Sequence, residues 1–527
     1  MNYADLFRVT LPETVLEISA LLVLVVDLGL LRKAALNVRL AVATALGVGG
    51  CGVAFIAVEL QGAKWLTFGK GGDFTLLGTG GFIDVAQIGI LVLTALTLLL
   101  LFDSVFTKHI GEFVAVMLMA AAGGMLIAAA QDLLVIFIGL ELLSLGLYIL
   151  TAFAKSSGKS AEAAMKYYLF GGMSAAFLLF GFSYFYGLTG TTDLALIQYR
   201  ISLAGPSPLF YVAWILVVAG LGFKVAVVPF HLWAPDTYEG APAPAAAFIA
   251  SVSKVASFAL LITLAMNWWL RPGGNLTTDG YTLEQILRAY SQTWPQLATV
   301  LLIASAASIV VGNLAALAQT SVRRLLAYSA IAHAGTILLG LAAHPTFAGK
   351  GTAVDFNFLS FFSTLHSMQA VLFYILTYGL TTVGAFGVVA VVERATGSDR
   401  LDSFLGLHKR NPLLAAVLLV LFLSLAGIPP LVGFWAKFNL FAAVLGEHGG
   451  AVPFALVCLA IAMSAVSLYY YLQVLKRAYV MPAPATDEGQ SPIKVHPVAM
   501  AALVGIAAAV VALGCFPTFL GRWIEGF

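Results

Sequence analysis

The sequence predicts an all-α polytopic membrane protein with about fourteen transmembrane helices. Of its 527 residues, 61% are hydrophobic and 10% are charged, and the mean hydropathy is +0.97. This composition excludes a soluble globular protein with an ordinary polar surface. Apolar runs of about 18 or more residues, the length that a spanning helix needs, recur along the whole chain. Lysines interrupt some of these runs, which indicates a membrane protein with an internal function.

The apolar runs place each expected span. They lie near residues 12–31, 38–60, 83–102, 112–130, 132–152, 163–187, 208–231, 241–267, 296–318, 324–343, 367–393, 412–443, 452–475 and 496–519. The N-terminus has no basic segment followed by a small-residue cleavage site, so we expect the first run to be a retained span.

Lys and Arg are distributed unevenly between alternate loops. The loops after odd-numbered spans hold fifteen of them and the loops after even-numbered spans hold six. Cytoplasmic loops carry the excess of basic residues, so both termini are expected on the side away from the cytoplasm.

Residues 221–261 are the most unusual stretch, because two apolar helices each carry one lysine, Lys224 and Lys254, on either side of an acidic, proline-rich turn. A lysine at the centre of a spanning helix costs roughly 2.5 to 3.5 kcal/mol, so such residues usually face a bundle interior or a water-filled cavity. Pro229 interrupts the first helix, and a break at this depth is tolerated where it lines a cavity or is buried in protein. The stretch therefore predicts a hydrated centre that carries charge.

Glu141 is a candidate partner for Lys224. It lies in the middle of an apolar span, with Ser144 and Tyr148 on the same helical face. A nearby lysine would keep this carboxylate ionised, and making or breaking the pair would shift proton affinity, as a proton switch requires. A static interhelical salt bridge is the alternative interpretation.

Other charged and titratable residues extend the set. His231 lies two turns beyond Lys224 and His333 lies deep in a span, and either could relay protons or be a satisfied structural histidine. Glu162 and Lys166 form an i, i+4 pair at the start of the sixth span, either on the surface or where protons enter. Lys437 is the third lysine within a span.

No pattern for a cofactor or metal site is found. The three cysteines, Cys51, Cys458 and Cys515, are far apart in apolar runs, and no CxxC, glycine-rich nucleotide loop, His/Cys cluster or nucleophile elbow is present. We expect the chain to bind no metal, no nucleotide and no redox centre.

The seventh and twelfth spans echo one another. GFKVAVVPFHLW and SLAGIPPLVGFWAKFNLF each combine glycine, proline and lysine, five spans apart. Interrupted spans at corresponding places in two halves are typical of repeated transporter architectures, and a repeat of five spans would make the halves inverted.

Five segments resemble the antiporter-like subunits of the proton-pumping NADH:quinone oxidoreductase, complex I, a group that also includes Mrp-type sodium/proton antiporter subunits. They are HLWAPDTYEGAPAPAAAFIASVSKVASFALL (231–261), DLLVIFIGLELLSLGLYIL (132–150), QTSVRRLLAYSAIAHAGTILLG (319–340), YGLTTVGAFGVVAVVE (378–393) and GIPPLVGFWAKF (427–438). The likeness is greatest to the bacterial N subunit, because a lysine stands at 437 and no long lateral helix follows the last span. Thr336 departs from the pattern, which commonly has an aromatic residue there.

The resemblance implies an organisation and a set of roles. Residues 1–110 would form helices 1–3. Two inverted five-helix repeats would follow, at 111–268 and 295–476, with broken helices at spans 7 and 12. Residues 495–527 would form the last helix. Glu141 and Lys224 would form the proton-loading pair, Lys254 the central site and Lys437 the distal site. His231 would help to hydrate the surroundings of Lys254 or relay protons around it, and Glu162 with Lys166 matches a polar pair of the family.

The resemblance also implies a function. The chain would be a proton-translocating membrane-arm subunit of a bacterial complex I in the inner (plasma) membrane, part of an enzyme but without a redox centre of its own. Its partners would be membrane subunits of the M, K, J, A, H and L types and a peripheral arm with FMN and iron–sulfur clusters, with quinone bound elsewhere and no role for nucleic acid. An Mrp-type antiporter subunit, a membrane-bound hydrogenase-type pump subunit and a purely structural scaffold are the alternatives.

Overall fold

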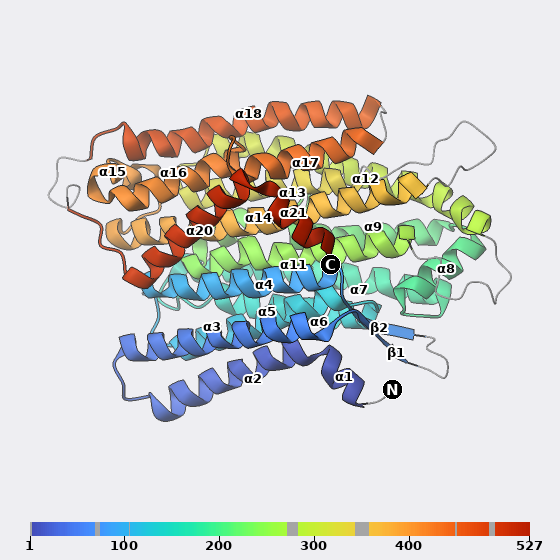
Figure 1. The fold of residues 1–527 in the computed structure, drawn as a ribbon, viewed down its shortest axis with the longest axis horizontal. Coiled ribbons are helices and arrows are strands. Elements are labelled where there is room, and N and C mark those ends of the chain that lie inside the picture. The colour runs from blue at the N-terminus through green and yellow to red at the C-terminus, as the bar shows by residue number, and fades with distance from the viewer. Residues whose placement is uncertain are drawn as a thin grey trace.

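The computed structural model describes residues 3–68, 74–104, 106–270, 283–342, 358–447, 451–483 and 491–526. Most helices run side by side along one direction, as a membrane bundle requires, and the chain passes from one edge of the bundle, where α2 and α3 lie, to the other, where α18 lies (Figure 1). The helix α20 returns obliquely across the bundle.

The N-terminal region forms the first edge of the bundle. Its elements are α1 (Tyr3–Val9), α2 (Leu11–Val25), the short π-helix η1 (Val26–Leu30), α3 (Leu36–Gln61), the strands β1 (Lys64–Phe68) and β2 (Phe74–Thr79), α4 (Phe82–Leu99) and the 3-10 turn η2 (Leu100–Asp103). The strands pair antiparallel with Lys64 opposite Thr79. This hairpin is a local addition that hydropathy alone did not predict.

The middle region contains the first broken span. Its helices are α5 (Ile110–Ala129), α6 (Leu133–Thr151), α7 (Gly158–Thr189), α8 (Leu194–Ala204), α9 (Pro208–Val225), α10 (Trp233–Gly240) and α11 (Ala243–Leu270). Asp132, Ser157, Asp193 and Ser207 begin α6, α7, α8 and α9, and each side chain accepts a hydrogen bond from a backbone N–H of the first turn. These caps fix where four of the helices start.

The C-terminal region contains the second broken span. Its elements are α12 (Leu283–Leu317), α13 (Val322–Ala342), α14 (Phe358–Thr396), η3 (Leu401–Phe404), α15 (Leu407–Arg410), α16 (Pro412–Ala426), α17 (Val432–Glu447), α18 (Ala451–Tyr479), α20 (Pro497–Cys515) and α21 (Pro517–Gly526).

The helices confirm an all-α polytopic membrane protein. Within the described residues, twelve helices are long and apolar enough to span a membrane, and α16 and α17 are shorter apolar helices. A helix lies at each expected span, the first at α2 and η1. The count of fourteen spans and the two inverted repeats stay predictions.

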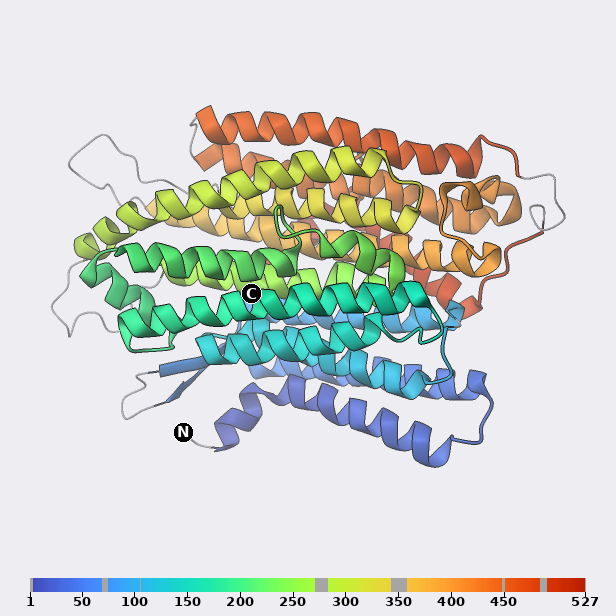
Figure 2. The same ribbon diagram turned by 180° about the vertical axis from the view of Figure 1, so that it is seen from behind.

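Both breaks begin with the same backbone motif. Ala226 follows α9 with φ 59°, and Gly427 follows α16 with φ 86°. In each case the next N–H bonds five residues back, from Val227 to Gly222 and from Ile428 to Leu423. This left-handed ending satisfies the last carbonyls of a helix and turns the chain out of it. Figure 2 shows the first break about midway along the bundle.

The centre of the bundle consists of α11, α13 and α14. All of the apolar window of α11 is buried within the chain, against 17% for α18 at the edge. Polar side chains on α11 and α13 are therefore enclosed by this chain alone.

Candidate functional site

Lys224 lies in the last turn of α9 and is buried. Its Nζ donates a 2.5 Å hydrogen bond to Ser144 Oγ on α6, and Ser144 in turn donates to the carbonyl of Leu140. The ammonium also lies 5.9 Å from the centre of the Tyr148 ring and 5.4 Å from that of Phe223. A cation at the negative end of a helix, between aromatic faces, is favourably placed.

Glu141 lies near Lys224 but does not form an ion pair with it within 4 Å in the described part of the chain. Its charge is close enough to act on the ammonium electrostatically. Ser144, three residues further along α6, is the residue that contacts Lys224 directly. Glu141 itself is only half-buried.

His231 lies in the break between α9 and α10 rather than on a continuous helix with Lys224. Its ring is half-buried, and Nδ1 is buried without a hydrogen-bond partner. The chain is not helical between Val225 and Trp233, so His231 does not lie two helical turns beyond Lys224 as the sequence predicted.

Lys254 lies in the middle of α11 and is only 3% exposed. Its Nζ donates a 2.6 Å hydrogen bond to the carbonyl of Ala330 on α13 and lies 5.8 Å from the centre of the Tyr378 ring on α14. No carboxylate pairs with this ammonium among the described residues. Backbone and aromatic groups alone hold it.

His333 lies one turn after Ala330 on α13 and is surrounded by tyrosines. Its Nδ1 is 2.9 Å from the hydroxyl of Tyr374, and its Nε2 is 3.3 Å from that of Tyr471. Tyr471 also bonds Ser329. Tyrosine hydroxyls can donate and accept, so the imidazole can exchange a proton on either side without moving its ring.

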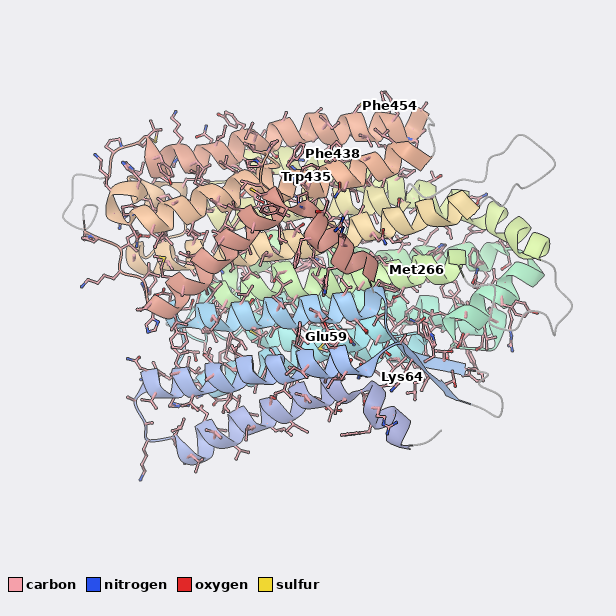
Figure 3. The ribbon with its side chains drawn as sticks, viewed as in Figure 1. Glu59, Lys64, Met266, Trp435, Phe438 and Phe454 are labelled. Atoms are coloured by element: carbon pink, nitrogen blue, oxygen red, sulfur yellow. The ribbon has the colours of Figure 1, made fainter. Side chains whose placement is uncertain are left out.

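Lys437 lies near the start of α17, just after the second break. Its Nζ donates to the carbonyl of Ala426, the last residue of α16, at 2.9 Å, and to Ser464 Oγ on α18 at 2.6 Å. Trp435 nearby donates through Nε1 to the carbonyl of Gly514 at 2.8 Å, and Figure 3 shows Trp435 and Phe438 beside α20. The end of α20 thus packs over the second break.

A polar cavity joins His333 to Lys437. It has a volume of about 20 Å³, enough for about one water molecule. Thr336, the residue that departs from the expected pattern, lines this cavity together with Asn313 and Ser467. Tyr470 lines it as well and donates to Asn313 Oδ1 at 3.1 Å. His333 and Lys437 therefore line one polar cavity, and Lys254 bonds the carbonyl of Ala330 one turn before His333 on α13, whereas Lys224 belongs to a separate cluster on α6 and α9.

Glu162 and Lys166 lie in an ion-pair network at one end of the bundle. Lys166 contacts Glu162 at 2.7 Å and Asp236 on α10 at 2.8 Å. Arg324 on α13 contacts Asp236 at 2.6 Å and Glu239 at 3.0 Å. The pair is thus part of a bridge from α7 through α10 to α13, away from the buried lysines.

Several residues around His333 and Lys437 were not predicted. Tyr374 and Tyr471 contact His333, Ser464 contacts Lys437, and Asn313 lines the cavity between them. They come from α14, α18 and α12, so no spacing along the chain signals that they meet. Ser144 and Tyr148 could be found, because they share a helical face with Glu141.

Lysines, hydroxyls and an imidazole can bind and transfer protons, and none of them carries electrons. Within the described residues no group of three His, Cys, Asp or Glu side chains could hold a metal ion. The absence of a cofactor in this chain stays a prediction.

Comparisons with known proteins agree on one family. The family described as NADH:quinone oxidoreductase/Mrp antiporter, TM matches residues 130–272, 276–362 and 354–463. NADH-quinone oxidoreductase subunit N 2 of Acidobacterium capsulatum is 44% identical, covering 100% of this chain and 99% of that protein. A chain of respiratory complex I from Thermus thermophilus is 32% identical with a TM-score of 0.73, covering 97% of this chain and 98% of that one.

A more distant structure has the same fold. A chain of the membrane-bound sulfane sulfur reductase, an archaeal respiratory membrane complex, is 25% identical with a TM-score of 0.77, covering 99% of this chain and 96% of that one. The protein therefore belongs to the NADH:quinone oxidoreductase/Mrp antiporter transmembrane family, among its subunit N members.

Proposed function

We propose that this chain is a proton-translocating membrane-arm subunit of an NADH:quinone oxidoreductase, and that Lys254, His333 and Lys437 conduct the proton through it. The subunit N relatives support the assignment to this enzyme. Electron transfer would take place in other subunits, which would hold FMN, iron–sulfur clusters and quinone, while this chain holds none of them.

The observation that carries the proposal is the kind of partner that each lysine has. All three ammonium groups bond hydroxyls or backbone carbonyls. Removing a proton from an ion-paired lysine would leave a buried, unpaired carboxylate, which is costly. Removing one from these lysines leaves a neutral amine among neutral groups. Each lysine can therefore alternate between two protonation states.

Glu141 would control the first lysine. Because it is near Lys224 without contacting it, an approach of the carboxylate would favour the charged lysine and a retreat would favour release of its proton. Glu141 and Lys224 would be the loading pair, His231 would hydrate the break, and Glu162 with Lys166 would lie where protons are taken up.

The chain would act in the inner membrane of a bacterium, with both termini away from the cytoplasm, beside the other membrane subunits and the peripheral arm. We place the two inverted repeats at 111–268 and 295–476, flanked by helices 1–3 in 1–110 and the last helix in 495–527.

The test is proton pumping and NADH:quinone activity in membranes that carry Lys224→Ala or Lys254→Met, with assembly of the complex measured in parallel. Lys155→Met, at an exposed lysine in the loop after α6, is the matched control. We expect the two buried variants to assemble but to lose pumping and coupled turnover together, and the control to keep both. Assembled complexes that pump normally without either buried lysine would contradict the proposal, and activity that needs sodium but not NADH would favour an antiporter.

A further inference from the structure

The first break contains a backbone N–H that is bound by a distant helix. Val227 still donates to Gly222 at the end of α9. The next N–H, that of Val228, donates to Ser308 Oγ on α12 at 2.8 Å. Ser308 is fully buried, and its own hydroxyl donates to the carbonyl of Ala304 at 2.6 Å. A serine oxygen can accept one hydrogen bond while its proton is donated elsewhere, so both bonds form together.

The second break is held differently. There the N–H of Gly433, near the start of α17, donates to Ser424 Oγ near the end of α16 at 3.2 Å. Both residues belong to the same broken span. The bond from Val228 to Ser308 instead joins positions 80 residues apart, in the two predicted repeats. The first break is therefore tied to a helix outside its own half of the chain.

The support behind Ser308 is firm, because α12 and α13 meet backbone to backbone. A Cβ added at Gly312 of α12 would lie 2.6 Å from the backbone nitrogen of Ala332. A Cβ added at Gly335 of α13 would lie 2.7 Å from the Cβ of Ser308 and 2.9 Å from the nitrogen of Ile309. Only glycine allows so close an approach. Helices packed this tightly do not shift independently, so a group bound to Ser308 is held against both of them.

The same two helices hold the partner of the central lysine. Ala330, whose carbonyl accepts from Lys254, lies on α13. Lys224 lies in the last turn of α9, four residues before Val228. The pair of α12 and α13 therefore contacts both the break that follows Lys224 and the ammonium of Lys254. The two lysines share no hydrogen-bond partner, but one rigid support fixes the surroundings of both.

We propose that Ser308 is a positioning residue that holds the first break against α12 and α13 and so keeps Lys224 close to Ser144 and Glu141. This inference rests on the proposed function and names a residue that sets the geometry of the loading pair. Ser308 does not bind the transferred proton, because its acceptor is occupied by a backbone N–H and its proton by a backbone carbonyl. Without Ser308, the N–H of Val228 would be left unpaired and would draw water into the break.

Hydrogen exchange in the assembled complex tests the contact without measuring activity. In Ser308→Ala the amide of Val228 should exchange at least about ten-fold faster than in the wild type, because it loses its acceptor. The matched control is Ser305→Ala. Ser305 is equally buried one turn earlier on α12, and it donates to the carbonyl of Gly335 and not to the break. The control should leave Val228 protected, and equal exchange in Ser308→Ala and wild type would overturn the proposal.

Pumping across a pH series tests whether the contact positions Lys224. Water at the loosened break would favour the charged ammonium, so in Ser308→Ala the alkaline limb of the pumping profile should move up by about one pH unit. The rate should fall several-fold. The titratable groups described around this ammonium, Glu141 and Tyr148 on α6, are the same in every variant.

Two further variants complete the pH series. Ser305→Ala should keep the wild-type profile. Ser308→Thr keeps the hydroxyl and should restore both the profile and the protection of Val228. A lower rate in Ser308→Ala with an unmoved profile would mean that Ser308 only supports packing, and the positioning role would be wrong.

The two proposals fail in different ways. If assembled complexes with Lys224→Ala pump normally, the proposed role of the loading pair fails, whatever hydrogen exchange shows at Val228. If Lys224→Ala abolishes pumping but Ser308→Ala changes neither exchange nor the pH profile, the function stands and the break is positioned by other contacts.

Discussion

The two broken spans hold their lysines in different ways. In the first, Lys224 belongs to the helix that ends, and Ser144 is the only hydrogen-bond partner of its ammonium in the described part of the chain. In the second, Lys437 belongs to the helix that begins, and it reaches back to the last carbonyl of α16 as well as to Ser464. Both ammonium groups thus lie at the negative end of a half-helix, which stabilises a cation there.

The neighbours of the two lysines differ as well. Lys224 has a carboxylate close by, Glu141, whereas Lys437 adjoins a cavity with room for about one water molecule. The first break is therefore suited to control by a charge that moves, and the second to exchange with water. The same backbone motif thus places the two lysines in different surroundings.

The largest effect is expected from an alanine at Gly427, one of the two residues with a left-handed backbone at the breaks. In Gly427→Ala, a methyl group would meet Lys437 Cδ at 3.0 Å and Nζ at 3.2 Å, at a φ of 86°. The left-handed conformation alone costs roughly 1 to 2 kcal/mol for a residue with Cβ, and crowding typically adds 1 to 3 kcal/mol. We expect a lower unfolding temperature of the purified complex and reduced pumping. Unchanged values for both would show that the break can relax around the methyl group.

The next effect compares the two serines. Ser144→Ala removes the hydroxyl that Lys224 contacts, and a hydrogen bond to a charged group is worth about 1.5 to 3 kcal/mol. Ser464→Ala leaves Lys437 with the carbonyl of Ala426. We therefore expect the alanine at 144 to lower the pumping rate more than the alanine at 464. The opposite order would mean that Lys437 depends chiefly on its serine.

A smaller effect of opposite sign is expected at the first break. Ala226 has φ 59° without being glycine, so Ala226→Gly relieves strain in the folded state but makes the unfolded chain more flexible. The net change should be a stabilisation of no more than about 1 kcal/mol, seen as a slightly higher unfolding temperature. A clear destabilisation would show that the methyl group of Ala226, which is fully buried, contributes packing that outweighs the strain.

The smallest effect concerns the ion pairs of α10, which lies outside the helices long enough to span. Burial acts to raise the pKa of Asp236, but hydrogen bonds from Lys166 and Arg324 hold that pKa below its usual value. A carboxylate with a lowered pKa contributes stability above its ordinary pKa of about 4, and this contribution is lost as the pH falls through the lowered value.

Asp236→Asn should therefore reduce stability at neutral pH by less than about 1 kcal/mol, because the pairs are partly exposed. The difference between variant and wild type should disappear in acid. Unfolding temperatures across a pH series measure it, and a difference that persists at low pH would contradict the ion-pair explanation.

The sequence predicted the lysines better than their surroundings. Hydropathy located the helices, and a lysine inside an apolar run is conspicuous, so Lys224, Lys254 and Lys437 could be named at once. Hydropathy does not reveal which faces of two helices meet, so the contacts of His333 with Tyr374 and Tyr471 were not foreseeable. Gly427 indicated a break by its residue type, whereas Ala226 gave no such signal because alanine rarely adopts its conformation.

The complete enclosure of α11 has a consequence for how this chain can be used. Its central lysine is surrounded by helices of the same polypeptide, so its direct contacts are made without a neighbouring subunit. Such an interior can keep the same contacts whichever subunit lies beside it. Related folds occur in a respiratory complex I and in a sulfane sulfur reductase, as expected for a fold whose central contacts come from one chain.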